Sequence, residues 1–367
     1  MKKVLFFPYH PDLWTLIDHK DSLKDYQLGG FISFKDDQQR IHMLNQALCL
    51  SDASYEQLIE CNDAVIILDN YRYYELDKYY EVIEDAINRQ KEVFITPLAE
   101  TQLDLTKYQG KYRLLESQPD GMESIEEEYT GRQRAGLDIR MYEIDTPIIA
   151  VIGQGKNCDK FKTQLLLKAV IDNEYITKTV ATNALGVLFG CYTLPSFLYS
   201  NLPFQDKIVR FNYFIYKLSK SKGLDVIILG IPEGIAPFKK KEFHHFAEFP
   251  LIAASAVQID LAILTTYFIK GKESELKSTL MDVAEYCQNR FNISIGAIAI
   301  SRTHFDIPSD DLIDKIAFEY LSNSFLHKYY PNVGGTKLPI ISMIDRDQAV
   351  TAIKMCLRTL EENVNVV

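Results

Sequence analysis

Short apolar runs alternate with longer amphipathic stretches along most of the chain, and this alternation restricts the folds open to it. In the first half, strand-like runs occupy Val4–Phe7, Gly30–Phe34, Ala64–Leu68 and Glu92–Ile95, and helix-like stretches occupy Gln39–Leu50 and Tyr74–Arg89. Strands that alternate with helices usually pair in parallel, with helices on both faces of the sheet. Residues 1–116 are therefore predicted to form a small Rossmann-like α/β domain.

The same alternation returns in the second half. Expected strands are Pro147–Ile152, Thr177–Ala181, Asp225–Leu229, Leu261–Thr266, Ser294–Ile300 and Leu338–Ser342, and expected helices are Lys160–Asp172, Asp206–Lys220, Lys272–Arg290, Asp310–His327 and Asp347–Leu360. This pattern predicts a second Rossmann-like domain over residues 147–367, with a doubly wound, mostly parallel sheet of the P-loop NTPase kind. Residues 117–146 are polar, acidic and glycine-rich, which is typical of a linker or an exposed excursion.

The turn after the first strand of this second domain is the main candidate for chemistry. In an open α/β sheet, backbone N–H groups and a helix N-terminus at such a turn favour phosphate. A long phosphate-loop register, as in dethiobiotin synthetase, places Gly153 on the first glycine and Lys160 on the phosphate-binding lysine. The candidate nucleotide or anion ligands are Gly153, Gln154, Gly155, Lys156, Asn157, Asp159, Lys160 and Phe161.

Two departures make this phosphate loop degenerate. Asp159 stands where the second glycine belongs and brings a negative charge, and Phe161 replaces the Ser or Thr that would hold magnesium. The dinucleotide pattern G-x-G-x-x-G also fails, because Cys158 takes its third glycine position. Three interpretations stay open: anion binding, NTP hydrolysis, or a relic loop in which Asp159 caps the helix and Lys160 pairs with a nearby acid.

Two further strand ends supply candidates for the wall of a pocket. Asp225 precedes an apolar run that leads into Pro232, Glu233 and Gly234, and no regular metal-binding acid ends that strand. We expect the Pro232–Gly234 loop to face the phosphate loop, although a plain Pro/Gly turn would explain it equally well. Ser301 and Arg302 end another strand and are weaker candidates, since an arginine after a strand often lies on the surface. No metal site is predicted.

Composition excludes several classes of protein. Lys plus Arg total 40 and Asp plus Glu total 50, so the net charge is −10, which argues against nucleic-acid binding. The stretch Pro250–Ile269 contains Gln258 and Asp260, and we interpret it as a strand of a soluble protein instead of a membrane span. The amino terminus reads as a first strand and not as a signal peptide. Six scattered cysteines without C-x-x-C pairs indicate free thiols in a cytoplasmic protein.

Two surface clusters suggest weaker hypotheses. Tyrosines gather in the segment NYRYYELDKYY, which favours either an interface, including one between copies of the chain, or a helix edge packed on the sheet. These tyrosines are Tyr71, Tyr73, Tyr74, Tyr79 and Tyr80. His244 and His245 follow three lysines, and this basic group is either a contact for phosphate or an acidic peptide, or simply a solvated loop.

Four segments resemble a known family: PIIAVIGQGKNCDKFKTQLLLK, TLPSFL, DKIVRFNYFIYKLSK and LDVIILGIPEGIAPF. The chain resembles the peptide maturation system proteins of clostridia and related bacteria, most clearly from Pro147 to Phe238. Glu233 departs from that family's glycine after Ile-Pro. The resemblance implies a role in maturing a ribosomally synthesised, post-translationally modified peptide, with a precursor peptide and a radical SAM maturase as partners. It implies no catalytic residues.

These observations lead to three functional hypotheses. The first is an accessory protein of peptide maturation that binds a nucleotide or another anionic ligand through the degenerate loop. The second is a non-catalytic scaffold that joins the precursor peptide and the radical SAM maturase. The third is an ATP-dependent enzyme resembling dethiobiotin synthetase.

Overall fold

The protein is described by a computed structural model that places most of the chain. The described residues are 1–50, 53–69, 75–120, 122, 140–237, 244–269, 273–306, 317–321, 325–326, 336–342 and 346–364. They divide into two units, Met1–Gln118 with Ala184–Asn201, and Pro119–Asn183 with Leu202–Val367. Within these ranges, no helix combines the length and the apolar character needed to cross a lipid bilayer.

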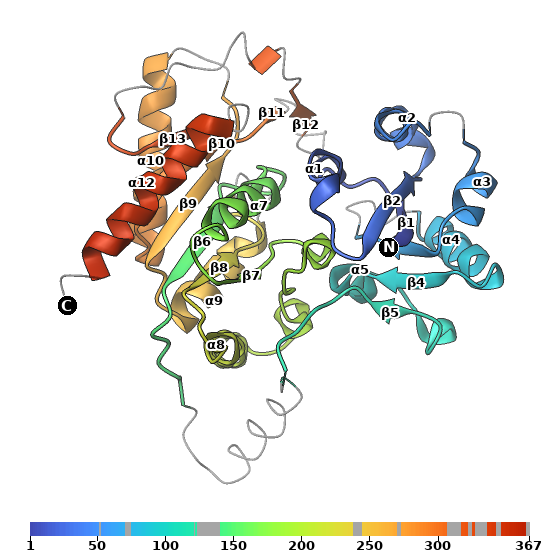
Figure 1. The fold of residues 1–367 in the computed structure, drawn as a ribbon, viewed down its shortest axis with the longest axis horizontal. Helices are drawn as coiled ribbons and strands as arrows, with labels where there is room; N and C mark the ends of the chain where they lie inside the picture. Colours follow the sequence, from blue (N-terminus) through green and yellow to red (C-terminus); the bar gives the residue numbers. More distant parts are fainter. Residues whose placement is uncertain are drawn as a thin grey trace. The chain divides into compact units, whose positions relative to one another are not determined.

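The first unit is built on a parallel sheet of five described strands in the order β2-β1-β3-β4-β5 (Figure 1). The strands are β1 (Lys2–Phe7), β2 (Tyr26–Phe31), β3 (Ala64–Ile67), β4 (Glu92–Ile95) and β5 (Arg113–Leu114). The helices are α1 (Leu13–Asp18), α2 (Gln38–Ala47), α3 (Tyr55–Glu60), α4 (Leu76–Asn88) and α5 (Pro97–Gln102), with short 3-10 turns at Lys20–Ser22, Lys35–Asp37 and Thr106–Tyr108. The predicted α/β class is confirmed.

Apolar residues on one face of this sheet explain why it forms. Leu5, Phe7 and Val65 have no solvent exposure and pack against Val82 and Ile83 of α4. Burial of such side chains contributes roughly 1.5–3 kcal/mol each. The strand prediction for Gly30–Phe34 is displaced, because the strand is Tyr26–Phe31. The apolar run continues past the strand end into buried residues, and the Ile32 N–H still donates to the Phe6 carbonyl at 2.9 Å.

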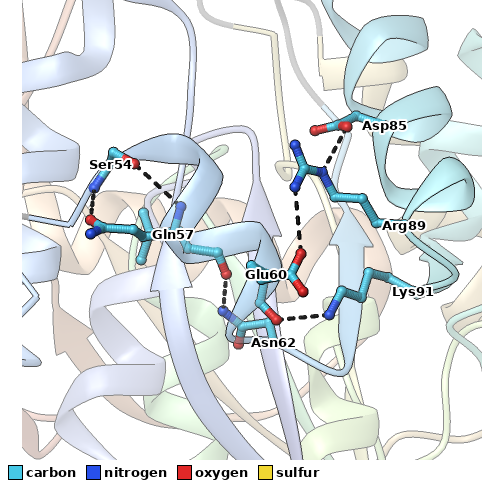
Figure 2. Close-up of polar contacts among 8 residues, drawn as sticks. Ser54, Gln57, Glu60, Asn62, Asp85, Arg89 and Lys91 are labelled. Atoms are coloured by element: carbon cyan, nitrogen blue, oxygen red, sulfur yellow. Dashed lines mark hydrogen bonds and ion pairs between the residues drawn. The ribbon is translucent and has the colours of Figure 1, made fainter.

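The short helix α3 is fixed at both ends by hydrogen bonds, which Figure 2 shows. Ser54 and Gln57 form a capping box: the Gln57 N–H donates to Ser54 Oγ at 3.3 Å, and the Ser54 N–H donates to Gln57 Oε1 at 2.8 Å. Beyond the helix, the Asn62 amide donates to the Leu58 carbonyl at 2.6 Å, and Lys91 Nζ donates to the Glu60 carbonyl at 2.7 Å. A helix of six residues is not stable in water on its own, so these contacts fix its position.

The second unit contains a parallel sheet of six described strands in the order β13-β10-β9-β6-β8-β7. The strands are β6 (Ile148–Gly153), β7 (Thr177–Val180), β8 (Val226–Gly230), β9 (Leu261–Thr266), β10 (Ile295–Ile300) and β13 (Ile340–Ser342). A separate antiparallel hairpin pairs β11 (Thr303–Asp306) with β12 (Ala317–Tyr320). All six expected strands of the large sheet are present.

Helices cover both faces of this sheet, as a doubly wound fold requires. They are α7 (Lys160–Ile171), α8 (Phe204–Ser219), α9 (Glu248–Ala256), α10 (Glu273–Phe291) and α12 (Arg346–Val364), with a 3-10 turn at His244–Ala247. The 3-10 turns at Ala184–Phe189 and Ser196–Tyr199 belong to the first unit. Leu167 of α7 and Ile353 of α12 pack on one face, against Val151 and Ile263. The chain leaves β6 toward one side of the sheet and leaves β9 toward the other, so the two strands flank the topological switch point (Figure 1).

Two sequence expectations about this unit need correction. The expected helix Asp310–His327 is wrong at Ala317–Tyr320, which forms β12 and pairs with β11. The stretch Pro250–Ile269 is not one strand: its first part belongs to α9 and only Leu261–Thr266 is extended. The apolar residues of α9 are buried, and their continuous run is also typical of a strand.

The second unit is also not one continuous stretch of sequence. Ala184–Asn201 groups with the first unit, where the Lys24 N–H donates to the Leu188 carbonyl at 2.7 Å and the Thr193 N–H donates to the Ser117 carbonyl at 2.9 Å. The predicted linker 117–146 lies largely outside the described residues, as do Tyr71, Tyr73 and Tyr74 and the lysines before His244. Tyr79 is buried, and its hydroxyl donates to the Leu68 carbonyl, so this tyrosine belongs to the core.

Candidate functional site

The turn after β6 lies at the carboxyl edge of the second sheet, at the switch point between β6 and β9. The paired positions Gly153–Thr265 and Ile300–Thr266 show that β6, β9 and β10 end at the same level. Ligands of open α/β sheets bind in the crevice at this point. The topology therefore places the Gly153–Lys160 loop where a binding site is expected.

The loop backbone requires a glycine at its start. A Cβ atom on Gly153 would lie 2.6 Å from Cys158 Sγ and 2.7 Å from Lys160 Cδ. The loop closes over this glycine because Asn157 and Asp159 adopt left-handed conformations, with φ of 56° and 57°. Gly153 thus allows the lysine side chain to pass directly over the strand end.

Lys160 is the first residue of α7 and is only 8% exposed. Its ammonium group donates to the Gly155 carbonyl at 2.5 Å and to the Glu233 carbonyl at 2.8 Å, and it lies 3.8 Å from Cys158 Sγ. Its oxygen acceptors are therefore main-chain carbonyls of two different loops. These contacts contradict the interpretation that Lys160 pairs with a nearby acidic side chain.

Asp159 occupies the N-cap position of α7, but its side chain makes no capping hydrogen bond. Asp159 Oδ2 instead accepts a hydrogen bond from the Arg302 N–H at 2.7 Å. The interpretation of a relic loop stabilised by an aspartate cap is therefore wrong in its mechanism. The carboxylate is held by the backbone that follows β10, which offsets part of its negative charge.

Several loop N–H groups have no hydrogen-bond acceptor among the described residues. Within the part of the chain that the structure describes, no hydrogen-bond acceptor is found for the backbone N–H groups of Gly155, Asn157, Cys158, Asp159 and Lys160. A helix N-terminus leaves such donors, and consecutive donors in a turn form a nest that favours an anion. These five donors and the Lys160 ammonium belong to one short segment.

The loop after β8 closes the opposite side of the site. The Ile235 N–H donates to the Gly153 carbonyl at 3.1 Å, and the carbonyl of Glu233 accepts from Lys160. The Glu233 carboxylate lies 3.3 Å from Lys156 Nζ, and both side chains are mostly buried, at 13% and 20% exposed. Glu233 itself is left-handed, with φ of 60°. Pro232 and Gly234 flank it in the same turn, which brings this part of the predicted wall next to the loop.

Ser301 and Arg302 are buried instead of exposed, at 1% and 7%. Ser301 Oγ donates to the Thr303 carbonyl and accepts from the Thr303 N–H, so it shapes the turn into β11. The Arg302 guanidinium lies over the Tyr320 ring, 4.6 Å from its centroid. The alternative of a surface arginine is wrong because the β11–β12 hairpin covers it. Arg302 reaches the phosphate loop through its backbone N–H.

The prediction that Asp225 lines the same pocket is wrong. Asp225 precedes β8, so it lies at the amino edge of a parallel sheet, away from the carboxyl ends. Asp225 Oδ2 accepts from the Ile176 N–H at 2.7 Å and so connects the start of β8 to the residue before β7. Asp225 borders a separate cavity of about 1270 Å³ at that edge.

Two residues that the sequence did not single out also contact the loop. Tyr267 follows β9, is fully buried, donates its hydroxyl hydrogen to the Lys156 carbonyl and donates its N–H to Gln154 Oε1 at 3.3 Å. Thr265 Oγ1 lies 3.0 Å from Cys158 Sγ, and its carbonyl accepts from the Gln154 N–H at 2.8 Å. The available signal was their place at the end of the strand that neighbours β6.

The residues around the loop differ from those of a magnesium-dependent phosphate loop. Among the described residues, no group of three or more His, Cys, Asp or Glu side chains is arranged to hold a metal. The end of β8 is Leu229 and Gly230, and Phe161 is 1% exposed at the position where a hydroxyl would coordinate magnesium. Thr163, one helical turn into α7, is fully buried. The arrangement therefore supplies donors and positive charge for a ligand.

Comparison with known proteins gives a likeness of fold. Neither a protein-family model nor a curated protein matches this sequence. The chain is similar to the crystal structure of a DUF1611 family protein from Anabaena variabilis, with 12% identity, a TM-score of 0.56, and coverage of 98% of this chain and 100% of the other. At this identity the likeness shows the fold alone, and it confirms the α/β architecture.

Two further solved structures have a lower structural similarity to this chain. An ADP complex of a nucleotide-binding protein from Archaeoglobus fulgidus has 12% identity and a TM-score of 0.27, covering 57% of this chain and 86% of its own. Chloroplast FtsY from Physcomitrella patens has 12% identity and a TM-score of 0.26, covering 79% of this chain and 78% of its own. TM-scores this low carry no argument about fold or ligand.

Proposed function

We propose that the second unit binds the phosphate group of a nucleotide, or a similar anionic ligand, at the loop between β6 and α7. The observation that carries the proposal is the combination of five loop N–H groups without an acceptor among the described residues and the buried Lys160 ammonium in the same segment. An anion would accept hydrogen bonds from those N–H groups, and charge-assisted hydrogen bonds are stronger than neutral ones.

The charges around the loop favour this interpretation. The N-terminus of α7 adds the equivalent of roughly half a positive charge. Lys156 and Lys160 come from the loop itself, while the Asp159 carboxylate is engaged by the Arg302 N–H. Because Lys160 is 8% exposed, its attraction for an anion is screened less by water and salt than that of a surface lysine.

The geometry favours binding over hydrolysis. Phosphoryl transfer by a P-loop protein relies on a hydroxyl and an acid that hold Mg²⁺ near the phosphates. Phe161 replaces the hydroxyl, and Leu229 and Gly230 end the strand where an acid would be expected. An ATP-dependent enzyme resembling dethiobiotin synthetase is thus the weaker proposal. Steady-state phosphate release from ATP that depends on Lys160 would revive it.

Calorimetry tests the binding proposal directly. ATP, GTP, ADP, GDP and pyrophosphate are titrated into the wild type, Lys160→Ala and Lys168→Ala. Lys168 lies near the other end of α7 and pairs with Asp172, so its removal changes the net charge equally without touching the loop. We expect binding by the wild type and Lys168→Ala, and a Kd at least tenfold higher for Lys160→Ala. Absence of wild-type binding to all five ligands would sink the proposal.

A second proposal concerns the biological role and rests on the resemblance of the sequence to peptide maturation system proteins. We propose that the protein acts in the cytoplasm as an accessory factor in maturing a ribosomally synthesised peptide, with the precursor peptide and a radical SAM maturase as partners. A non-catalytic scaffold that joins these two partners is the alternative within this role. Co-purification tests both versions: if neither a neighbouring precursor peptide nor its maturase is retained on the immobilised protein, the role is refuted.

A further inference from the structure

The loop carries a second lysine whose charge is already balanced from within the protein. Lys156 Nζ lies 3.3 Å from the Glu233 carboxylate, with the two side chains 20% and 13% exposed. Glu233 comes from the turn after β8, about eighty residues further along the chain, so the pair closes across the site. The same residue offers its main-chain carbonyl to Lys160 at 2.8 Å. One residue therefore contacts both ammonium groups of the phosphate loop.

We infer that Glu233 is an internal counter-anion, and that a ligand with two or more linked phosphates displaces its carboxylate from Lys156. This inference rests on the proposed anion binding at the loop. A carboxylate beside a loop lysine competes with a phosphate for the same charge, because two anions at one ammonium repel each other. Glu233 thus lowers the affinity of the site and selects ligands that carry enough charge to replace it.

The number of linked phosphates that the ligand needs follows from the placement of the two lysines. Lys160 is the more buried lysine and lies beside the N–H groups for which the described residues offer no acceptor, where a single phosphate would bind. Lys156 is more exposed, and its ammonium group lies 3.3 Å from the Glu233 carboxylate. A monophosphate can bind at Lys160 without disturbing the Lys156–Glu233 pair. A diphosphate adds a second charged group within reach of Lys156, so only the longer anion exchanges places with the carboxylate.

The conformation of the turn keeps Glu233 in this position. Glu233 has a φ of 60°, a backbone conformation that residues other than glycine and asparagine rarely adopt. The neighbouring Ile235 N–H is bonded to the Gly153 carbonyl, which ties the turn to the base of the loop. A glycine would suit the backbone better. The presence of a glutamate at a strained position is accounted for when its carboxylate has a task at the site.

The substitution Glu233→Gln tests the effect of the carboxylate charge alone. The substitution keeps the length of the side chain, the left-handed backbone and the main-chain carbonyl that Lys160 uses, and it removes only the negative charge. Glu174→Gln is the matched control, since Glu174 forms an exposed pair with Lys354 beyond the far end of α7 and its loss changes the net charge equally. Urea unfolding of each variant establishes that it is folded.

Calorimetry with pyrophosphate and with inorganic phosphate gives the decisive comparison. We expect Glu233→Gln to lower the Kd for pyrophosphate by roughly threefold to tenfold, in line with removal of a competing, partly buried charge. The Kd for inorganic phosphate and all values for Glu174→Gln should stay within twofold of the wild type. In a Lys156→Ala background the gain from Glu233→Gln should vanish, because the lysine that benefits is gone.

The possible results distinguish failure of this inference from failure of the proposed anion binding. If the wild type binds pyrophosphate in a Lys160-dependent way and Glu233→Gln leaves the Kd unchanged or raises it, the inference is overturned while anion binding stands. A gain that persists without Lys156, or that is equal for inorganic phosphate, overturns it as well. If neither the wild type nor Glu233→Gln binds either anion, the anion site itself is refuted. Binding by Glu233→Gln alone also overturns the inference, because the diphosphate would then fail to displace the carboxylate of the wild type.

Discussion

Gly153→Ala is the substitution whose effect can be worked out most completely from the structure. The three nearest atoms to the new methyl group would be Cys158 Sγ at 2.6 Å and Lys160 Cδ and Cγ at 2.7 and 2.9 Å. Carbon atoms in proteins normally pack at about 3.5–4.0 Å, so all three contacts are overlaps. The lysine stem must therefore move, and its ammonium group must leave at least one of its two carbonyl acceptors.

The expected cost follows from these contacts. Overpacking a buried site costs about 1–3 kcal/mol, and losing a hydrogen bond made by a charged group costs about 1.5–3 kcal/mol. These are two descriptions of the same displacement and do not add. Alanine also restricts the unfolded chain, which offsets about 0.4–1 kcal/mol. We expect Gly153→Ala to lower the free energy of unfolding by about 2 kcal/mol, and to weaken anion binding because Lys160 is displaced.

Urea unfolding followed by circular dichroism measures this change. Trp14 is the chain's single tryptophan and lies in α1 of the first unit, so its fluorescence monitors that unit separately. The refuting comparison is a double-mutant cycle with Cys158→Ala and Lys160→Ala, which together remove all three overlapping atoms. In that background Gly153→Ala should be neutral or slightly stabilising. If the substitution costs the same in both backgrounds, overlap with these side chains is not the cause.

Three further predictions test other parts of the structure. Asp159→Gly should be more stable than Asp159→Ala by about 1–2 kcal/mol in urea unfolding, because both lose the carboxylate but only alanine is strained at a φ of 57°; equal stabilities would contradict the left-handed conformation. Asn45→Ala should cost about 2 kcal/mol or more, since the buried side chain bonds both the N–H and the carbonyl of Phe31 at 2.9 Å, and a loss below 0.5 kcal/mol would count against this. Burial raises the pKa of the Cys287 thiol to about 12 and of the Cys356 thiol to about 11. Because these folded-state pKa values lie above the unfolded value of about 8.5, the two protonated thiols stabilise the fold fully below that pH, and this contribution is lost as the pH rises toward 11–12. Between about pH 8 and 10.5, the free energy of unfolding in urea should therefore decline less for a double alanine variant than for the wild type.

The sequence by itself determined the class of fold and the position of the loop. Buried parallel strands need continuous apolar runs, so Ala64–Ile67 and Leu261–Thr266 could be located from composition alone. The strand, glycine-led turn and helix from Ile148 to Ile171 are a local pattern as well. Local patterns are readable because neighbouring residues decide them, through side-chain periodicity and backbone preference.

The tertiary structure decided what the loop can do. Asp159 looked like an obstacle or a cap, and only the position of β10 shows that the Arg302 N–H takes its carboxylate. Arg302 looked exposed, but the β11–β12 hairpin buries it, and pairing with β11 makes 317–320 a strand where a helix was predicted. The Lys156–Glu233 pair joins residues from separate loops. Such contacts depend on which strands lie side by side, and strand order is set by the packing of the whole unit, which no single segment encodes.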